Sequence, residues 1–152
     1  MIFDDAAWHY NGDYPAGMPA VAAATHIGLF VAWAQLNGLG AQRHDGARAD
    51  LQGRVVMPGA WFLANCGEQL TDLDLSDEGN RFATDYYLYD EDRHEDGDPS
   101  YLPDYAKSFP DAENAYSVAD TWESYDRLGP LLAARFAMWQ GRNRSKGTED
   151  GL

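Results

Sequence analysis

Six acidic side chains near the middle of the chain are the residues whose types and spacing most suggest chemistry. They are Asp90, Glu91, Asp92, Glu95, Asp96 and Asp98. A calcium-binding loop spaces oxygen ligands at alternate positions around a glycine in sixth place. A frame that starts at Asp92 has Gly97 in that place, but Pro103 stands where a bidentate glutamate is expected. We therefore predict that these six residues bind a basic partner or form a solvated loop. A calcium-responsive loop using Asp92, Asp96 and Asp98 is a further alternative.

The four histidines are too scattered along the chain to predict a zinc site, which needs a cluster of three or four ligands. They are His9, His26, His44 and His94. His26 lies among alanine, glycine and leucine, which favours a buried, hydrogen-bonded role, and His9 follows Trp8, which favours a role in binding the N-terminal segment to the helices. The sequence therefore predicts no metal and no cofactor.

A small pocket is the alternative interpretation of His26. Polar and aromatic residues recur in segments that look helical, and these residues can line a cavity of a small enzyme or ligand-binding domain. They are His26, Trp33, Asp120, Trp122 and Tyr125. Asp120 and Glu123 lie one helical turn apart, as do Glu123 and Arg127. Paired carboxylates can transfer protons, but helix caps and surface ion pairs are the more common roles. Asp120 can also anchor the N-terminal segment through Asp4 or Asp5.

Cys66 is the single cysteine, so no internal disulfide can form. It ends a hydrophobic segment and is expected to be a small buried side chain. A cysteine nucleophile needs a base beside it, and no base is evident from the sequence. The chain also has no phosphate-binding loop, no dinucleotide fingerprint and no nucleophile elbow. These absences disfavour an enzyme, and cysteine usage indicates a reducing compartment, which we take as the cytoplasm.

The formal net charge of −14 limits the classes of partner that this chain is expected to bind. Phosphates repel carboxylates, so neither nucleic acid nor an anionic membrane is an expected partner. Residues 72–126 contain seventeen acids and three bases, whereas residues 127–152 contain two acids and five bases. The acidity is thus concentrated in the middle of the chain, where it favours solubility, pairing with the basic C-terminal helix, or association with a basic protein.

The elements that must position these residues are expected to be helices. Residues 19–37 carry apolar side chains almost all round, which predicts a central helix ending at Asn37-Gly38. A second helix is expected over residues 58–66, with Pro58 at its start and Gly67 at its end. Thr71 or Ser76 is expected to cap a third helix, on which Phe82, Tyr86 and Tyr89 repeat at helical spacing.

The last helical region is expected over residues 118–140, with a break or kink at Gly129-Pro130 that gives two pieces. Residues 40–56 indicate a loop or short helix, and residues 101–105 a helical turn. Val55-Val56-Met57 is the only short stretch that suggests a strand. The fold class we predict is all-α: a single compact domain over residues 1–140, of four to six helices, with an aromatic, irregular N-terminal segment. Residues 141–152 are predicted to form a flexible C-terminal tail.

Four stretches taken together resemble an uncharacterised family of small bacterial domains of unknown function. They are residues 8–15, residues 24–33 with Ala-Thr-His-Ile-Gly, residues 73–87, and residues 118–128 with Ala-Asp-Thr-Trp-x-x-Tyr-Asp-Arg-Leu. The resemblance covers about residues 4–140. It implies no catalytic residues, and we associate such acidic domains with immunity proteins of bacterial toxin systems.

These observations together predict a non-catalytic acidic binding protein. Its most concrete form is an immunity protein that binds and inhibits a cognate bacterial toxin. Toxins that attack nucleic acids have basic active clefts, which an acidic surface can cover by electrostatic complementarity. The alternative is a small enzyme or ligand-binding domain with a pocket around His26, Trp33 and Trp122.

Overall fold

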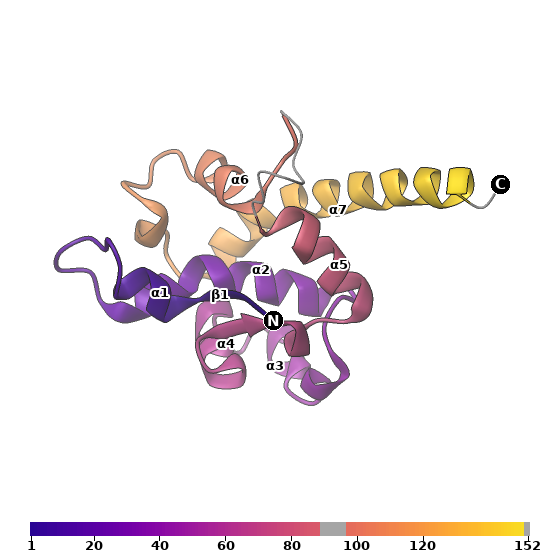
Figure 1. Ribbon diagram of the computed structural model, residues 1–152. Helices are drawn as coiled ribbons and strands as arrows, with labels where there is room; N and C mark the ends of the chain where they lie inside the picture. Colours follow the sequence, from indigo (N-terminus) through magenta and orange to yellow (C-terminus); the bar gives the residue numbers. More distant parts are fainter. Residues whose placement is uncertain (89–96, 151–152) are drawn as a thin grey trace.

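The computed structural model describes residues 1–88 and 97–150, with side chains as far as Asn143 (Figure 1). The described residues form seven α-helices: α1 (Ala6–Tyr10), α2 (Thr25–Leu36), α3 (Arg48–Gln52), α4 (Pro58–Cys66), α5 (Asp77–Tyr86), α6 (Tyr101–Ser108) and α7 (Trp122–Asp150). They also form strands β1 (Ile2–Asp5) and β2 (Gln69–Thr71), and 3₁₀ turns at Ala20–Ala24, Gln42–His44, Asp72–Asp74 and Ala115–Ser117. The helix-rich prediction is confirmed, but the fold is not purely α, and its helices outnumber the predicted four to six.

Helix α2 lies at the centre of the fold, and every residue from Thr25 to Gln35 is buried. Its most extensive contacts are with α4, and it also packs against α3 and α7. Helices α2 and α4 approach closely at Gly28 and Gly59: a Cβ atom built on Gly28 would lie 2.6 Å from the Gly59 Cα. The predicted central helix is confirmed, although residues Ala20–Ala24 form a 3₁₀ turn before α2 begins.

Local signals correctly place the ends of α4 and α5. Pro58 is the first residue of α4, and Gly67 ends that helix with a left-handed φ of 60°. The Ser76 side chain accepts a hydrogen bond from the Gly79 N–H and so caps α5. The other predicted cap, Thr71, accepts from the Leu73 N–H and begins the 3₁₀ turn Asp72–Asp74 instead.

Of the predicted break or kink at Gly129-Pro130, the break is wrong, because α7 continues through Pro130 as one helix. Proline in a helix removes one backbone hydrogen bond and crowds the carbonyl four residues earlier. Pro130 is exposed, so that carbonyl lies on the solvent side, while buried Leu128 and Leu132 hold the opposite face against the core. Helix α7 also continues past the predicted boundary at residue 140, and its C-terminal part extends beyond the other helices (Figure 1).

The N-terminal segment is more regular than the sequence predicts. Residues Ile2–Asp5 pair antiparallel with Gln69–Thr71, and Ala6–Tyr10 form α1 directly afterwards. The predicted irregular structure is found only after α1. The predicted strand at Val55-Val56-Met57 is wrong: these residues are irregular, and Val55 is exposed.

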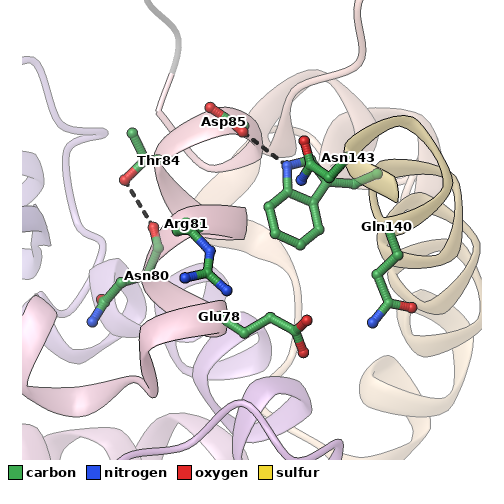
Figure 2. Close-up of a pocket in the computed structure, with 8 residues that line it drawn as sticks. Glu78, Asn80, Arg81, Thr84, Asp85, Gln140 and Asn143 are labelled. Carbon is green, nitrogen blue, oxygen red and sulfur yellow. Dashed lines mark hydrogen bonds between the residues drawn. The ribbon is translucent and has the colours of Figure 1, made fainter. Parts of the chain in front are cut away.

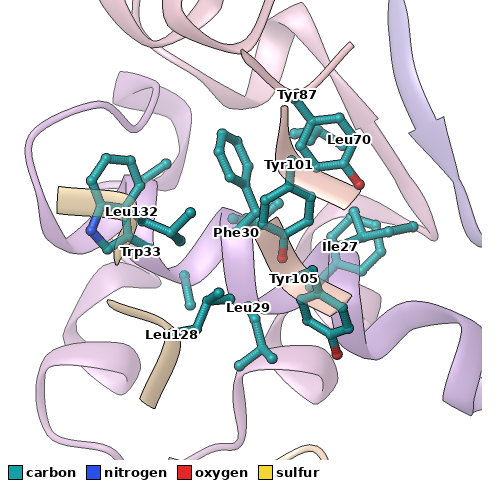
Figure 3. Packing of buried hydrophobic residues seen from close by; sticks show 14 of the residues in the cluster. Ile27, Leu29, Phe30, Trp33, Leu70, Tyr87, Tyr101, Tyr105, Leu128 and Leu132 are labelled. Atoms are coloured by element: carbon teal, nitrogen blue, oxygen red, sulfur yellow. The ribbon is translucent and has the colours of Figure 1, made fainter. Parts of the chain in front are cut away.

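The core is dominated by aromatic rings that gather around α2. Figure 3 shows Phe30 of α2 among Tyr87, Tyr101 and other buried side chains from different parts of the chain. The rings of Tyr87 and Tyr101 stack with centroids 4.8 Å apart, which favours their mutual packing beyond buried area alone. Among the described residues, no helix combines the length and apolar character that crossing a membrane requires.

Candidate functional site

One carboxylate and two imidazoles from three elements meet beside the N-terminal strand. Asp4 lies in β1, His9 in α1 and His26 at the start of α2. His9 Nε2 lies 2.8 Å from Asp4 Oδ1, and His26 Nε2 lies 3.3 Å from Asp4 Oδ2. We call these three residues the Asp4 cluster. It is an arrangement that can relay protons or ligate a metal ion.

Local structure explains why the Asp4 cluster forms. Asp5 caps α1 by accepting a hydrogen bond from the Ala7 N–H, so the chain passes directly from strand to helix. This turn places His9 next to Asp4, five residues earlier. Strand β1 also lies beside the buried first turn of α2, and this brings His26 within reach of the same carboxylate.

Tyrosines surround the Asp4 cluster. The Tyr87 hydroxyl donates to Asp4 Oδ2, and the Tyr116 hydroxyl lies 2.9 Å from His9 Nδ1. The ring of Tyr105 lies 6.1 Å from that of His26, centroid to centroid. Within the described residues, the Tyr105 hydroxyl has no hydrogen-bond partner although it is buried, and the same holds for both ring nitrogens of His26.

Burial and proximity act in opposite directions on the ionisable groups of the Asp4 cluster. Burial favours a protonated Asp4, but the nearby His26 and His9 side chains, with Tyr87, outweigh it and hold the pKa of Asp4 well below its ordinary value. Burial lowers the pKa of His26, against the opposing effect of Asp4. His26 therefore tends to the neutral imidazole, which has one nitrogen lone pair to offer.

The residues of the predicted pocket do not meet at one place. His26 belongs to the Asp4 cluster, whereas the Trp33 ring packs against Phe30, Phe82 and Phe136 in the core. Trp122 and Tyr125 pack on each other, and the Arg54 guanidinium lies 4.6 Å from the Trp122 ring centroid. This stacking favours the charged guanidinium beside two aromatic faces. The pocket residues are thus divided among several environments.

Asp120 acts as a helix cap, one of the roles weighed from the sequence. Its two carboxylate oxygens accept hydrogen bonds from the backbone N–H groups of Gly59 and Ala60, 2.7 and 3.1 Å away. These groups belong to the first turn of α4, where unpaired N–H groups favour a carboxylate. Burial raises the pKa of Asp120, and the two hydrogen bonds oppose that effect.

A second group of possible metal ligands lies at the C-terminal end of α4, which Cys66 forms. His44 Nε2 lies 2.8 Å from Asp74 Oδ1 and 3.9 Å from Cys66 Sγ. The other oxygen of Asp74 accepts from Thr71 and completes the cap of the 3₁₀ turn. Burial, together with the Asp74 carboxylate, raises the pKa of the Cys66 thiol. This group is therefore poorly suited to supply the thiolate that a metal or a nucleophilic reaction needs.

We expect Cys66 to react slowly with disulfide reagents such as DTNB in the folded protein. The thiolate is the nucleophile, and burial beside Asp74 disfavours it, so the folded chain should react at least about tenfold more slowly than the chain in urea. Stopped-flow absorbance at pH 8 measures both rates. Equal rates in the folded and unfolded chain would contradict the placement of this thiol.

A groove of about 540 Å³ lies between α5 and the distal part of α7. Figure 2 shows Glu78 of α5 pointing toward Gln140 of α7. The Trp139 indole N–H donates a hydrogen bond to Asp85 Oδ2, 2.8 Å away. Asp98 lies 3.5 Å from Arg142 at an adjoining hollow. The other predicted partner-binding and calcium-binding acids, Asp90, Glu91, Asp92, Glu95 and Asp96, lie outside the described residues.

Sequence reasoning missed the partners of the histidines. Asp4 was weighed only as an anchor for Asp120, and Tyr87 and Tyr116 were not singled out. The five-residue spacing from Asp4 to His9 fits neither helix nor strand periodicity, because a strand-to-helix junction lies between them. The pairing of β1 with β2 that fixes this junction joins residues far apart in the sequence.

Comparison with known families decides the membership of this chain. A family model described as a domain of unknown function (DUF7832) matches residues 2–118. The chain belongs to this family. The matched range contains the Asp4 cluster and the helices from α1 to α6, and it ends before α7. No curated protein and no solved structure gives a significant match.

Proposed function

We propose that this DUF7832 protein is a non-catalytic acidic binding protein that recognises a basic protein. The most concrete form of the proposal is an immunity protein that binds and inhibits a cognate bacterial toxin in the cytoplasm. The observation that carries it is the surface position of the acids in the acidic middle of the chain. Within 72–88 and 97–126, ten of the twelve carboxylates are exposed or partly exposed, and only Asp74 and Asp104 are buried.

The same two ranges contain only two bases, Arg81 and Lys107, so acids outnumber bases there. Three of the carboxylates, Asp72, Asp98 and Asp126, pair with cationic groups from elsewhere in the chain. The fields of like charges add, and they raise the local concentration of a basic partner and its association rate. The groove between α5 and α7 supplies the second requirement of a binding site. It holds a partly buried tryptophan, Trp139, beside Glu78, and interfaces draw much of their binding energy from aromatic side chains of this kind.

We expect a double variant, Asp77→Asn with Glu78→Gln, to weaken binding to the toxin encoded beside this gene by roughly tenfold at low salt. The reason is the loss of two carboxylates at the start of α5, one of which lines the groove. Calorimetric titration at low and high salt measures the affinity, and co-expression measures protection of cells from the toxin.

The matched control is Asp111→Asn with Glu113→Gln, which removes the same charge from the exposed loop after α6. An equal loss in both double variants would indicate a general charge effect instead of a site at α5. Wild-type protein that neither binds the toxin nor protects cells would contradict the immunity proposal.

The alternative proposal, a small enzyme or ligand-binding domain, draws less support from the predicted pocket than from the Asp4 cluster. His26, Trp33 and Trp122 contact different neighbours. The Asp4 cluster, in contrast, holds ionisable groups in direct contact, and one of its histidines keeps buried nitrogens without partners among the described residues.

A further inference from the structure

The nitrogens of His26 are the most unusual polar atoms in the described part of the chain. The side chain is 1% exposed, Nδ1 has no hydrogen-bond partner there, and Nε2 lies 3.3 Å from Asp4 Oδ2 without forming an aligned hydrogen bond. An unpaired polar atom that is removed from water costs roughly 1–3 kcal/mol. Such atoms call for an explanation, and the position of Nε2 beside Asp4 and His9 points to a ligand that this nitrogen binds.

The distances in the Asp4 cluster fit the first coordination shell of a small divalent ion. One ligand atom from each residue can be chosen so that all three lie within 4.8 Å of one another. Two ligands that each lie about 2.0–2.2 Å from a tetrahedral zinc ion are separated by roughly 3.3–3.5 Å. The separation of His26 Nε2 from Asp4 Oδ2 is 3.3 Å. His9 Nε2 lies 2.8 Å from the other oxygen, Oδ1, so binding through one carboxylate oxygen requires the Asp4 carboxylate to turn as this separation widens.

Neighbouring groups hold two of the three side chains, His9 and Asp4, as metal-binding proteins hold their ligands. Outer hydrogen bonds fix the ring orientation of a ligating histidine and the position of a ligating carboxylate. Here the Tyr116 hydroxyl lies within hydrogen-bonding distance, 2.9 Å, of His9 Nδ1, the ring nitrogen that faces away from Asp4. The Asp5 N–H and the Tyr87 hydroxyl donate to the two oxygens of Asp4. The side chains of His9 and Asp4 are thus oriented by hydrogen bonds before any ion arrives.

We propose that Asp4, His9 and His26 bind one divalent transition-metal ion of the zinc class. Two imidazoles and one carboxylate suit zinc and similar ions, whereas calcium prefers a larger set of oxygen ligands. Three protein ligands leave a coordination position for water or another small ligand. His9 is the most exposed of the three side chains, at 20%, so the ion enters and the open position faces solvent on its side.

The test is calorimetric titration of untagged, EDTA-treated protein with zinc chloride, comparing wild type, His9→Gln and Cys66→Ser. Each variant removes one ligand from one of the two groups of possible metal ligands. We expect one zinc ion per chain, an unchanged affinity for Cys66→Ser, and an affinity at least about tenfold lower for His9→Gln. Absence of binding to wild type, full binding to His9→Gln, or loss of binding in Cys66→Ser would each overturn the proposal.

Two further measurements keep the test decisive if His9→Gln disturbs the fold. Tyr116→Phe leaves all three ligands in place and removes only the group on His9 Nδ1, so we expect it to fold and to bind zinc about tenfold more weakly. Cobalt(II) serves as a spectroscopic probe in wild type. We expect visible absorption without thiolate-to-cobalt charge transfer. A charge-transfer band would assign the ion to Cys66 and contradict the proposal.

Discussion

Gly28→Ala should destabilise the protein by about 3 kcal/mol, although alanine is the better helix former. A Cβ atom at this position would lie 2.6 Å from the Gly59 Cα and 2.9 Å from both Gly59 N and Pro58 O. All three atoms belong to the backbone of α4, so no side chain can rotate away. Helices α2 and α4 must therefore separate, and the buried contacts between them are lost. Urea unfolding monitored by circular dichroism measures the free-energy change.

The control for this prediction is the same substitution in open space. Gly141 lies in α7, and a Cβ atom added there meets nothing within 4 Å. Gly141→Ala should raise the free energy of unfolding by roughly 0.5–1 kcal/mol, the ordinary gain of alanine over glycine in a helix. If Gly28→Ala were stabilising as well, α2 and α4 would not approach as closely as the structure has them.

The sequence predicts well those features that depend on a few neighbouring residues. Pro58 and Gly67 bound α4, and Ser76 caps α5, because each acts on the backbone within one helical turn. The pairing of β1 with β2, which the sequence did not predict, depends instead on residues far apart in the chain. Burial along β1 does not alternate, and its partner β2 lies more than sixty residues later, so nothing local signals the pairing.

The helix through Pro130 shows how packing overrides a local rule. Proline disfavours a helix interior by about 3 kcal/mol. The sequence shows this proline but does not show the packing that offsets its cost. The compensation comes from Leu128 and Leu132, which are both buried. Only the folded chain shows that these two leucines flank the proline on the core side.

The Asp4 cluster could be predicted only in part for the same reason. His26 was expected to be buried, and it is. Its proximity to Asp4 and His9 follows from the β1–β2 pairing and from the packing of α1 near the start of α2. The sequence interpretation placed Trp33, Trp122 and Asp120 beside His26, but it could not show how their segments pack against one another. Asp120 instead reaches the first turn of α4, a contact between residues sixty positions apart.

Asp104→Ala should cost about 3 kcal/mol of the free energy of unfolding, among the largest effects of any single carboxylate in the described chain. Asp104 is buried in α6 and accepts hydrogen bonds from Arg135 Nε and Nη2, 2.8 and 3.1 Å away. It also accepts from the Tyr86 hydroxyl at 2.7 Å. One carboxylate therefore joins α5, α6 and α7, and its removal leaves a partly buried guanidinium and a buried hydroxyl without their acceptor.

The matched control is Asp126→Ala, because Asp126 also accepts two hydrogen bonds from one arginine, here from Nη1 and Nη2 of Arg54 at 2.9 and 2.6 Å. That pair is exposed: the side chains of Arg54 and Asp126 are 46% and 56% accessible, against 29% and 3% for Arg135 and Asp104. Water replaces the lost partner at the exposed site but cannot do so at the buried one. Asp126→Ala should thus leave the free energy of unfolding nearly unchanged in the urea experiment. Equal losses of unfolding free energy for the two substitutions would contradict the prediction. They would show that the buried Asp104 pair is no more costly to break than the exposed Asp126 pair, and that Asp104 does not join the three helices.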